Sequence, residues 1–81
     1  GQYEIQIGAY GSLGDAQAAL RQTKGKANRL LAGYASVAQP ARVAGKQVYR
    51  ARFAGFAADA AARTCSELRR RSINCFVMTS E

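Results

Sequence analysis

Two similar stretches decide the fold: YEIQIGAY at residues 3–10 and YRARFAGF at residues 49–56. In each stretch, apolar and polar residues alternate, two small residues and an aromatic residue follow, and an Asp–Ala pair comes shortly afterwards. Alternation with a period of two is typical of a strand that buries one face. The Asp–Ala pair is placed to begin a helix, because an acidic residue is favourable in a first turn. The chain therefore carries a faint internal repeat of strand, corner and helix.

The remaining elements follow from apolar periodicity and from the positions of glycine and proline. Apolar residues three and four apart predict a helix over residues 15–31, which Gly33 ends. The stretch 34–43 contains Pro40, so it is predicted to be an edge strand or an interrupted one. The other elements are a strand over 3–9, a turn at 44–46, a strand over 47–53, a helix over 57–72 and a strand over 74–79.

This βαββαβ order is the split-βαβ layout, which ferredoxin-like and RNA-recognition domains share. We expect an α+β fold in which two helices cover one face of a four-stranded antiparallel sheet. The 81 residues form a single domain over 1–81 with its core at about 3–79, and no apolar run is long enough to span a bilayer. The chain opens on polar residues without a signal peptide, so we interpret it as a mature fragment or an excised domain.

The second face of the sheet is left to water or a ligand. On the first strand the alternation turns Tyr3, Ile5, Ile7 and Ala9 toward the helices. On the third strand it turns Tyr49 and Phe53 the same way. Gln, Arg and large apolar side chains together are unusual for a merely solvated face, so the pattern favours binding over solvation. The residues assigned to this open face are Gln6, Arg50, Arg52, Phe76 and Met78.

Composition excludes several chemistries. The chain has no histidine, which rules out His-based zinc sites, Ser-His-Asp triads and Cys-His dyads, and its two cysteines cannot fill a four-thiolate site. The motifs Ser-x-x-Lys, Lys-Thr-Gly and Gly-x-Ser-x-Gly are missing, and the five acidic residues are scattered. We therefore expect a binding module and not an enzyme, with no catalytic residue, no metal site and no cofactor.

The net charge of +7, with nine of twelve cations being arginine, points either to an anionic partner or simply to solubility. Single-stranded RNA is one alternative partner, because the same layout stacks bases on strand aromatics. In the third strand, however, Arg50 and Arg52 stand where such a module has its stacking residues. A basic RNA-binding domain of similar fold remains the alternative function.

Cys65 and Cys75 are either a disulfide or two buried thiols that fill the same space. Cys65 lies on the apolar stripe of the second helix, and Cys75 shares the helix-facing side of the last strand with Val77. The strand returns alongside the helix, so a bridge is within reach. We expect the bridge.

The two quoted stretches resemble the SPOR domain, the sporulation-related repeat. Its half-repeats read roughly as apolar-Gln-apolar-Gly-small-aromatic and Tyr-Arg-Val-x-apolar-Gly-x-Phe, and the likeness extends over about residues 3–78. The later part of the chain is most similar to SPOR domains at the C-terminus of bacterial D-alanyl-D-alanine carboxypeptidases. Ala54 stands where the second half-repeat usually has glycine and Ala51 where valine is common, and both departures affect packing more than binding.

The resemblance implies a module that binds peptidoglycan, prefers glycan strands stripped of their stem peptides, and targets its parent protein to the division septum. It implies the periplasm of a Gram-negative bacterium, where a disulfide would persist, and a parent enzyme whose catalytic domain lies upstream. We expect a monomer that binds denuded glycan and no nucleic acid. The expected glycan contacts are Gln6, Ala9, Tyr10, Ser12, Tyr49, Arg50, Arg52, Phe76 and Met78. Tyr49 is included from the resemblance, against the alternation that turns it toward the helices, because the end of a strand can twist outward.

Overall fold

The computed structural model describes residues 1–80, so Glu81, the last residue of the expected domain, lies outside the described part. None of the helices within residues 1–80 is long and apolar enough to cross a membrane. The elements in chain order are β1 (Tyr3–Tyr10), α1 (Leu13–Lys26), α2 (Asn28–Leu31), β2 (Ala35–Val43), β3 (Lys46–Phe56), α3 (Ala58–Arg70) and β4 (Phe76–Thr79).

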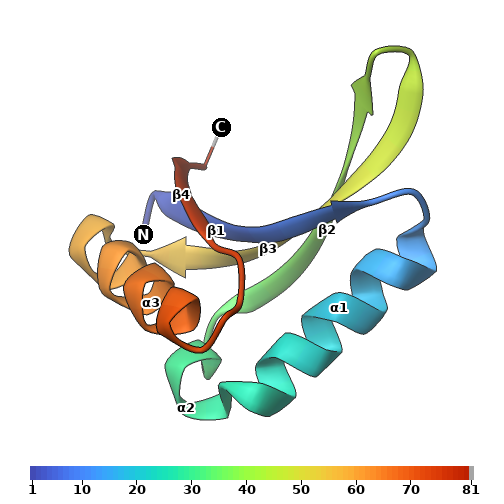
Figure 1. The fold of residues 1–81 in the computed structure, drawn as a ribbon. Helices are drawn as coiled ribbons and strands as arrows, with labels where there is room; N and C mark the ends of the chain where they lie inside the picture. The colour runs from blue at the N-terminus through green and yellow to red at the C-terminus, as the bar shows by residue number, and fades with distance from the viewer. Residues whose placement is uncertain (81) are drawn as a thin grey trace.

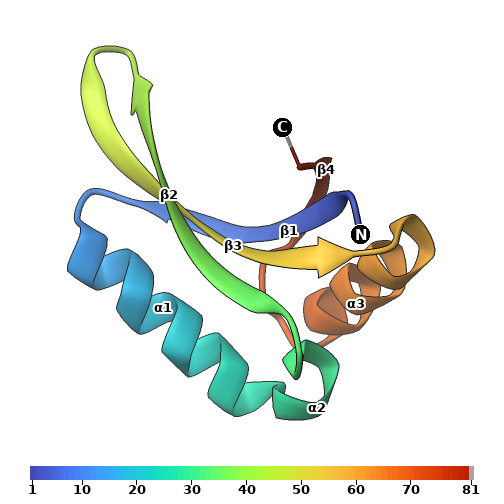
Figure 2. The same ribbon diagram turned by 180° about the vertical axis from the view of Figure 1, so that it is seen from behind.

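The strands form one sheet in the order β2-β3-β1-β4, and every neighbouring pair is antiparallel. Helices α1 and α3 lie on the same face of the sheet and approach each other at their C-terminal ends, which leaves the opposite face uncovered (Figures 1 and 2). This arrangement confirms the predicted α+β fold of the split-βαβ type.

The first helix differs from the prediction at both ends. It begins at Leu13, because Ser12 is the N-cap and its hydroxyl accepts the backbone N–H of Asp15 at 3.1 Å. The predicted single helix over 15–31 is divided at Ala27, whose φ of −136° and ψ of 46° are not helical. The short helix α2 follows, so the domain has three helices, where two were expected. Similar end shifts lengthen β3 to Phe56 and delay β4 to Phe76.

A β-bulge in β1 reverses the direction of the side chains that follow it. Gln6 pairs with Arg52 and Gly8 pairs with Ala51, so one extra residue of β1 lies between these pairs. Ala9 then pairs with Arg50 on the open face, where it is exposed. The expectation that Ala9 faces the helices is therefore wrong, because it assumed unbroken alternation.

A second bulge lies at the other end of the β1–β3 pair. Tyr3 pairs with Phe56 and Glu4 with Ala54, which leaves Gly55 as the extra residue of β3. Its φ of 103° lies in the left-handed region that favours glycine. The second bulge thus lies within the small-small-aromatic corner at residues 54–56, and the first lies directly before the corner at residues 8–10.

The core lies between the helices and the central strands β1 and β3. Tyr34 stacks on Phe56 with ring centroids 3.6 Å apart, which seals the core beside α2. Burying a side chain such as Phe56 contributes about 2 kcal/mol to the free energy of unfolding. The largest fully buried side chains are Phe53, Phe56, Ile5, Leu31, Leu68 and Cys65.

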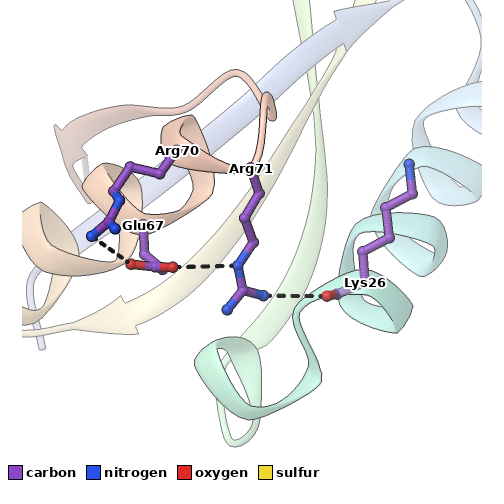
Figure 3. Close-up of polar contacts among 4 residues, drawn as sticks. All are labelled: Lys26, Glu67, Arg70 and Arg71. Atoms are coloured by element: carbon purple, nitrogen blue, oxygen red, sulfur yellow. Dashed lines mark hydrogen bonds and ion pairs between the residues drawn. The ribbon is translucent and has the colours of Figure 1, made fainter.

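The C-terminal ends of α1 and α3 are tied together by one arginine (Figure 3). Arg71 Nη1 donates to the carbonyl oxygen of Lys26 at 3.3 Å, and its Nε lies 3.4 Å from Glu67 Oε2. Arg70 lies 3.6 Å from the other oxygen of the same carboxylate. Arg71 thereby donates to a carbonyl at the end of α1, where the last carbonyls receive no hydrogen bond from their own helix.

The structure joins Cys65 of α3 and Cys75, directly before β4, by a disulfide with a Cα–Cα distance of 5.2 Å. Both residues are buried in the core. Since β4 has only four residues, the bridge fixes the start of a short edge strand to the helix beneath it.

Removing this bridge should lower the free energy of unfolding by up to about 3 kcal/mol, as expected for closing so short a loop. We expect a lower melting temperature after reduction and in the variant Cys65→Ala/Cys75→Ala, measured by circular dichroism. Reduction should not change the melting temperature of that variant, which is the control. Alkylation of both cysteines in the unreduced, oxidised protein would contradict the bridge.

Candidate functional site

The open face of the sheet is organised in cross-strand rows, because paired residues of neighbouring strands point to the same side. All five residues that the sequence assigned to this face lie on it, together with Ala9. The central row is Val37, Arg52, Gln6 and Phe76, and the rows on either side are Gln39, Arg50 and Ala9, and Ala35, Ala54, Glu4 and Met78.

Arg52 is fixed at the centre of this face. Its Nε donates to Gln6 Oε1 at 3.0 Å, and its Nη1 lies 3.5 Å from Glu4 Oε1. The side chains of Arg52 and Glu4 are only 14% and 18% exposed, so solvent screens this ion pair less than a surface pair. Because Gln6 accepts through its oxygen, its amide N–H groups remain available to a ligand.

Arg50 is the neighbouring cation and is differently placed. Within residues 1–80 its side chain makes no hydrogen bond or ion pair, and it lies between Gln39 and Ala9. A guanidinium in this state keeps all its donors for a planar anion such as a carboxylate.

An apolar end completes the face on β4. Phe76 lies beside Gln6 and is 62% exposed, and Met78 lies beside Glu4. A solvent-exposed aromatic ring next to amide and guanidinium donors is suited to a ligand with both an apolar face and polar edges.

The face is concave. In Figure 1 the β2–β3 hairpin rises at one end of the sheet and β4 rises at the other. A hollow of about 320 Å³ lies on this side, lined by Glu4, Gln39, Pro40, Ala41, Arg50, Arg52 and Ser80. Both arginines thus border one hollow.

Three of the predicted contacts lie elsewhere. Tyr10 and Tyr49 pair with each other and pack against the core on the helix side, as the alternation predicted for Tyr49. The Tyr10 ring lies across Gly8, so that a Cβ at Gly8 would meet it. Ser12 caps α1 and uses its hydroxyl there.

Sequence reasoning missed Glu4, Gln39 and Ser80, which line the hollow. Glu4 alternates with Ile5 on the same side as Gln6, so the pattern contained that signal. Gln39 directly precedes Pro40, which pairs with Tyr49 on the helix side. Neighbouring residues of a strand point to opposite faces, so Gln39 belongs to the open face. Ser80 follows the last strand, where alternation gives no guidance.

Most of the positive charge lies away from the open face, on the helices and the hairpin. Part of it is neutralised locally: Arg63 donates to Asp59 at 3.0 Å, and this hydrogen bond lowers the pKa of the exposed Asp59 carboxyl. Within residues 1–80 no group of His, Cys, Asp and Glu is arranged to hold a metal ion. The open face therefore offers hydrogen bonds, one available guanidinium and an aromatic ring.

Comparisons with known proteins identify one family. The SPOR domain profile matches residues 1–79. The crystal structure of the RlpA SPOR domain from Pseudomonas aeruginosa is 18% identical, with a TM-score of 0.73 over 96% of this chain and 97% of that one. The solution structure of the peptidoglycan-binding domain of the B. subtilis cell wall lytic enzyme CwlC is 20% identical, with a TM-score of 0.68 over 100% of this chain and 91% of that one. No curated protein matches the sequence.

The two arginines should differ in their effect on stability. Arg52→Ala leaves the half-buried groups of Glu4 and Gln6 without their partner and should lower the free energy of unfolding by about 2 kcal/mol. Arg50→Ala removes no side-chain hydrogen bond or ion pair within residues 1–80 and should change it by less than about 0.5 kcal/mol. Urea denaturation of both variants measures the difference, and equal losses would contradict this account of Arg52.

Proposed function

The chain belongs to the SPOR domain family, and on this premise we propose that it binds peptidoglycan through the open face of its sheet. Family membership also agrees with the sequence-based expectation of a binding module and not an enzyme. The observation that carries the proposal is Arg50, a guanidinium available at the hollow beside the fixed Arg52.

The ligand we propose is a glycan strand without stem peptides. Removing the peptide frees the lactyl carboxylate of each N-acetylmuramic acid, and Arg50 can take this group bidentately. The amide of Gln6 donates to an acetamido oxygen or a sugar hydroxyl, while its oxygen stays with Arg52. The ring of Phe76 lies against the apolar face of a sugar.

The remaining predicted contacts take lesser roles in this proposal. Ala9 is small and exposed beside Arg50, so a sugar can approach the backbone there. Met78 extends the apolar end beyond Phe76. Tyr10, Ser12 and Tyr49 lie at the rim or below the face, where they support its shape.

RNA is disfavoured as the ligand by the placement of the aromatic rings. Base stacking by a sheet of this layout needs aromatic side chains on the open face of the central strands. In β3 the rings of Tyr49 and Phe53 belong to the core side, and the exposed ring of the open face is Phe76 on an edge strand.

Binding of denuded glycan would place the protein in the bacterial cell envelope. We propose a periplasmic location with enrichment at the division septum, where such strands are produced, and a parent enzyme that the domain carries there. A buried disulfide is consistent with an oxidising compartment.

Sacculus pull-down tests the proposal. The domain should bind amidase-treated sacculi more strongly than intact ones, because the treatment exposes the lactyl carboxylates. Arg50→Ala should weaken this binding roughly tenfold or more, as expected for a lost charge-assisted bidentate contact, and Gln6→Ala by less. The matched control is Arg29→Ala, which removes an exposed arginine of α2.

Two outcomes would refute the site or the ligand. If Arg50→Ala and Gln6→Ala bind treated sacculi as well as Arg29→Ala does, the open face is not the site. If the domain binds single-stranded RNA at micromolar concentration in 150 mM salt, with a steep salt dependence and no sacculus binding, the ligand is RNA.

A further inference from the structure

The outer edge of β2 is a second surface with the features of a binding site. β2 is a terminal strand of the sheet and has nine residues, whereas the opposite terminal strand, β4, has four. In Figure 2, β2 crosses the front of the sheet and α1 runs below it. A terminal strand leaves a row of backbone N–H and C=O groups unpaired, and these groups can pair with another extended chain.

Two features fix which backbone groups of β2 point outward. Pro40 has no N–H to donate, so it is tolerated in β2 only at a position whose nitrogen faces away from the neighbouring strand β3. The β2–β3 turn is Ala44–Gly45, with φ of 52° and 79°, and in two-residue turns of this kind the closing pair is hydrogen-bonded. Counting back from that pair gives the same result: Ser36, Ala38, Pro40 and Arg42 direct their backbone groups outward.

The same even-numbered residues turn their side chains to the helix side, above a groove between β2 and α1. This groove, here called the β2–α1 groove, has a volume of about 470 Å³ and is lined by Gln17, Leu20, Arg21, Lys24, Ser36 and Ala38. Leu20 is buried and Ala38 is half-buried, so the groove has an apolar floor. A strand added beside Ser36 and Ala38 would place alternate side chains over this groove.

The wall that α1 contributes is cationic. Arg21 and Lys24 both line the groove, and neither makes an ion pair with an acidic residue within residues 1–80. Carboxylates on the alternate side chains of an added strand would meet these two cations, and the amide of Gln17 can donate a further hydrogen bond.

From these features we propose that β2 binds an extended, acidic segment of another polypeptide as a fifth strand of the sheet. Its backbone pairs with the outward groups of Ser36 and Ala38 and with the carbonyl of Pro40. Its acidic side chains, two residues apart, contact Arg21 and Lys24. A second copy of this chain fits less well, because pairing two β2 strands would bring like charges together in a protein of net charge +7.

The test uses the ¹⁵N-labelled domain and a blocked octapeptide of alternating threonine and glutamate, which is acidic and favours an extended backbone. We expect saturable NMR shift changes at Ser36, Ala38, Arg21 and Lys24, and little change at Arg50 and Phe76. The matched peptide with lysine in place of glutamate should bind at least tenfold more weakly. Raising the salt concentration should weaken binding of the acidic peptide, because salt screens the charges of an exposed groove.

Two sets of variants separate the charges from the backbone pairing. Arg21→Glu/Lys24→Glu should bind the acidic peptide at least tenfold more weakly. Arg29→Glu/Lys46→Glu, which makes the same charge change at exposed positions outside the groove, should bind as the parent does. Ser36→Pro removes one outward N–H and should weaken binding three- to tenfold, while Ser36→Ala keeps that N–H and should not.

Thermal unfolding of each variant confirms that the fold is retained. The proposal is overturned if the peptide causes no saturable shifts, if the shifts map to the open face, or if both double variants bind equally. It is also overturned if Ser36→Pro and Ser36→Ala bind alike, or if sedimentation shows β2-mediated dimers of the domain that exclude the peptide. Sacculus binding by Arg21→Glu/Lys24→Glu should remain at the parent level. A loss of peptide binding in this variant can therefore be distinguished from a failure of the glycan proposal.

Discussion

One-sided cover of the sheet is the constraint on which the rest of this structure depends. Helices of 14 and 13 residues are long enough to bury one face of β1 and β3, and no further element within residues 1–80 covers the other. The covered face takes the large apolar side chains, including Phe53 and Ile5. The open face must be stable in water, and it is held by contacts among its own side chains, with Arg52 between Gln6 and Glu4.

The placement of charge matters more here than its amount. The net charge of +7 suggests an anionic partner, yet only two of the cations, Arg50 and Arg52, lie in the rows of the open face. One of these is committed to an internal ion pair. Under the proposed function, the face would distinguish ligands by the position of a single available guanidinium and its neighbours, which suits a patterned ligand better than a uniform polyanion.

Alternation predicted the fold and most of the open face because it reports directly which side of a strand is buried. It located Gln6, Arg50, Arg52, Phe76 and Met78, and it kept Tyr49 with the core. It misplaced Ala9, because a bulge adds one residue without changing the composition of the strand. The break at Ala27 was equally hidden, since Ala is the best helix former and its non-helical backbone angles have no signal in the residue type.

The two ends of the described chain lie side by side: Tyr3 pairs with Thr79, and Ser80 N–H donates to the Gln2 carbonyl at 2.8 Å. A tensile load applied to both ends would therefore peel β4 from β1 one hydrogen bond at a time, the geometry of least mechanical resistance. The peeling would stop at Cys75, because the covalent link to Cys65 transfers the load to α3. A domain held at both ends would therefore release the four residues of β4 under tension while its central strands and core stay folded.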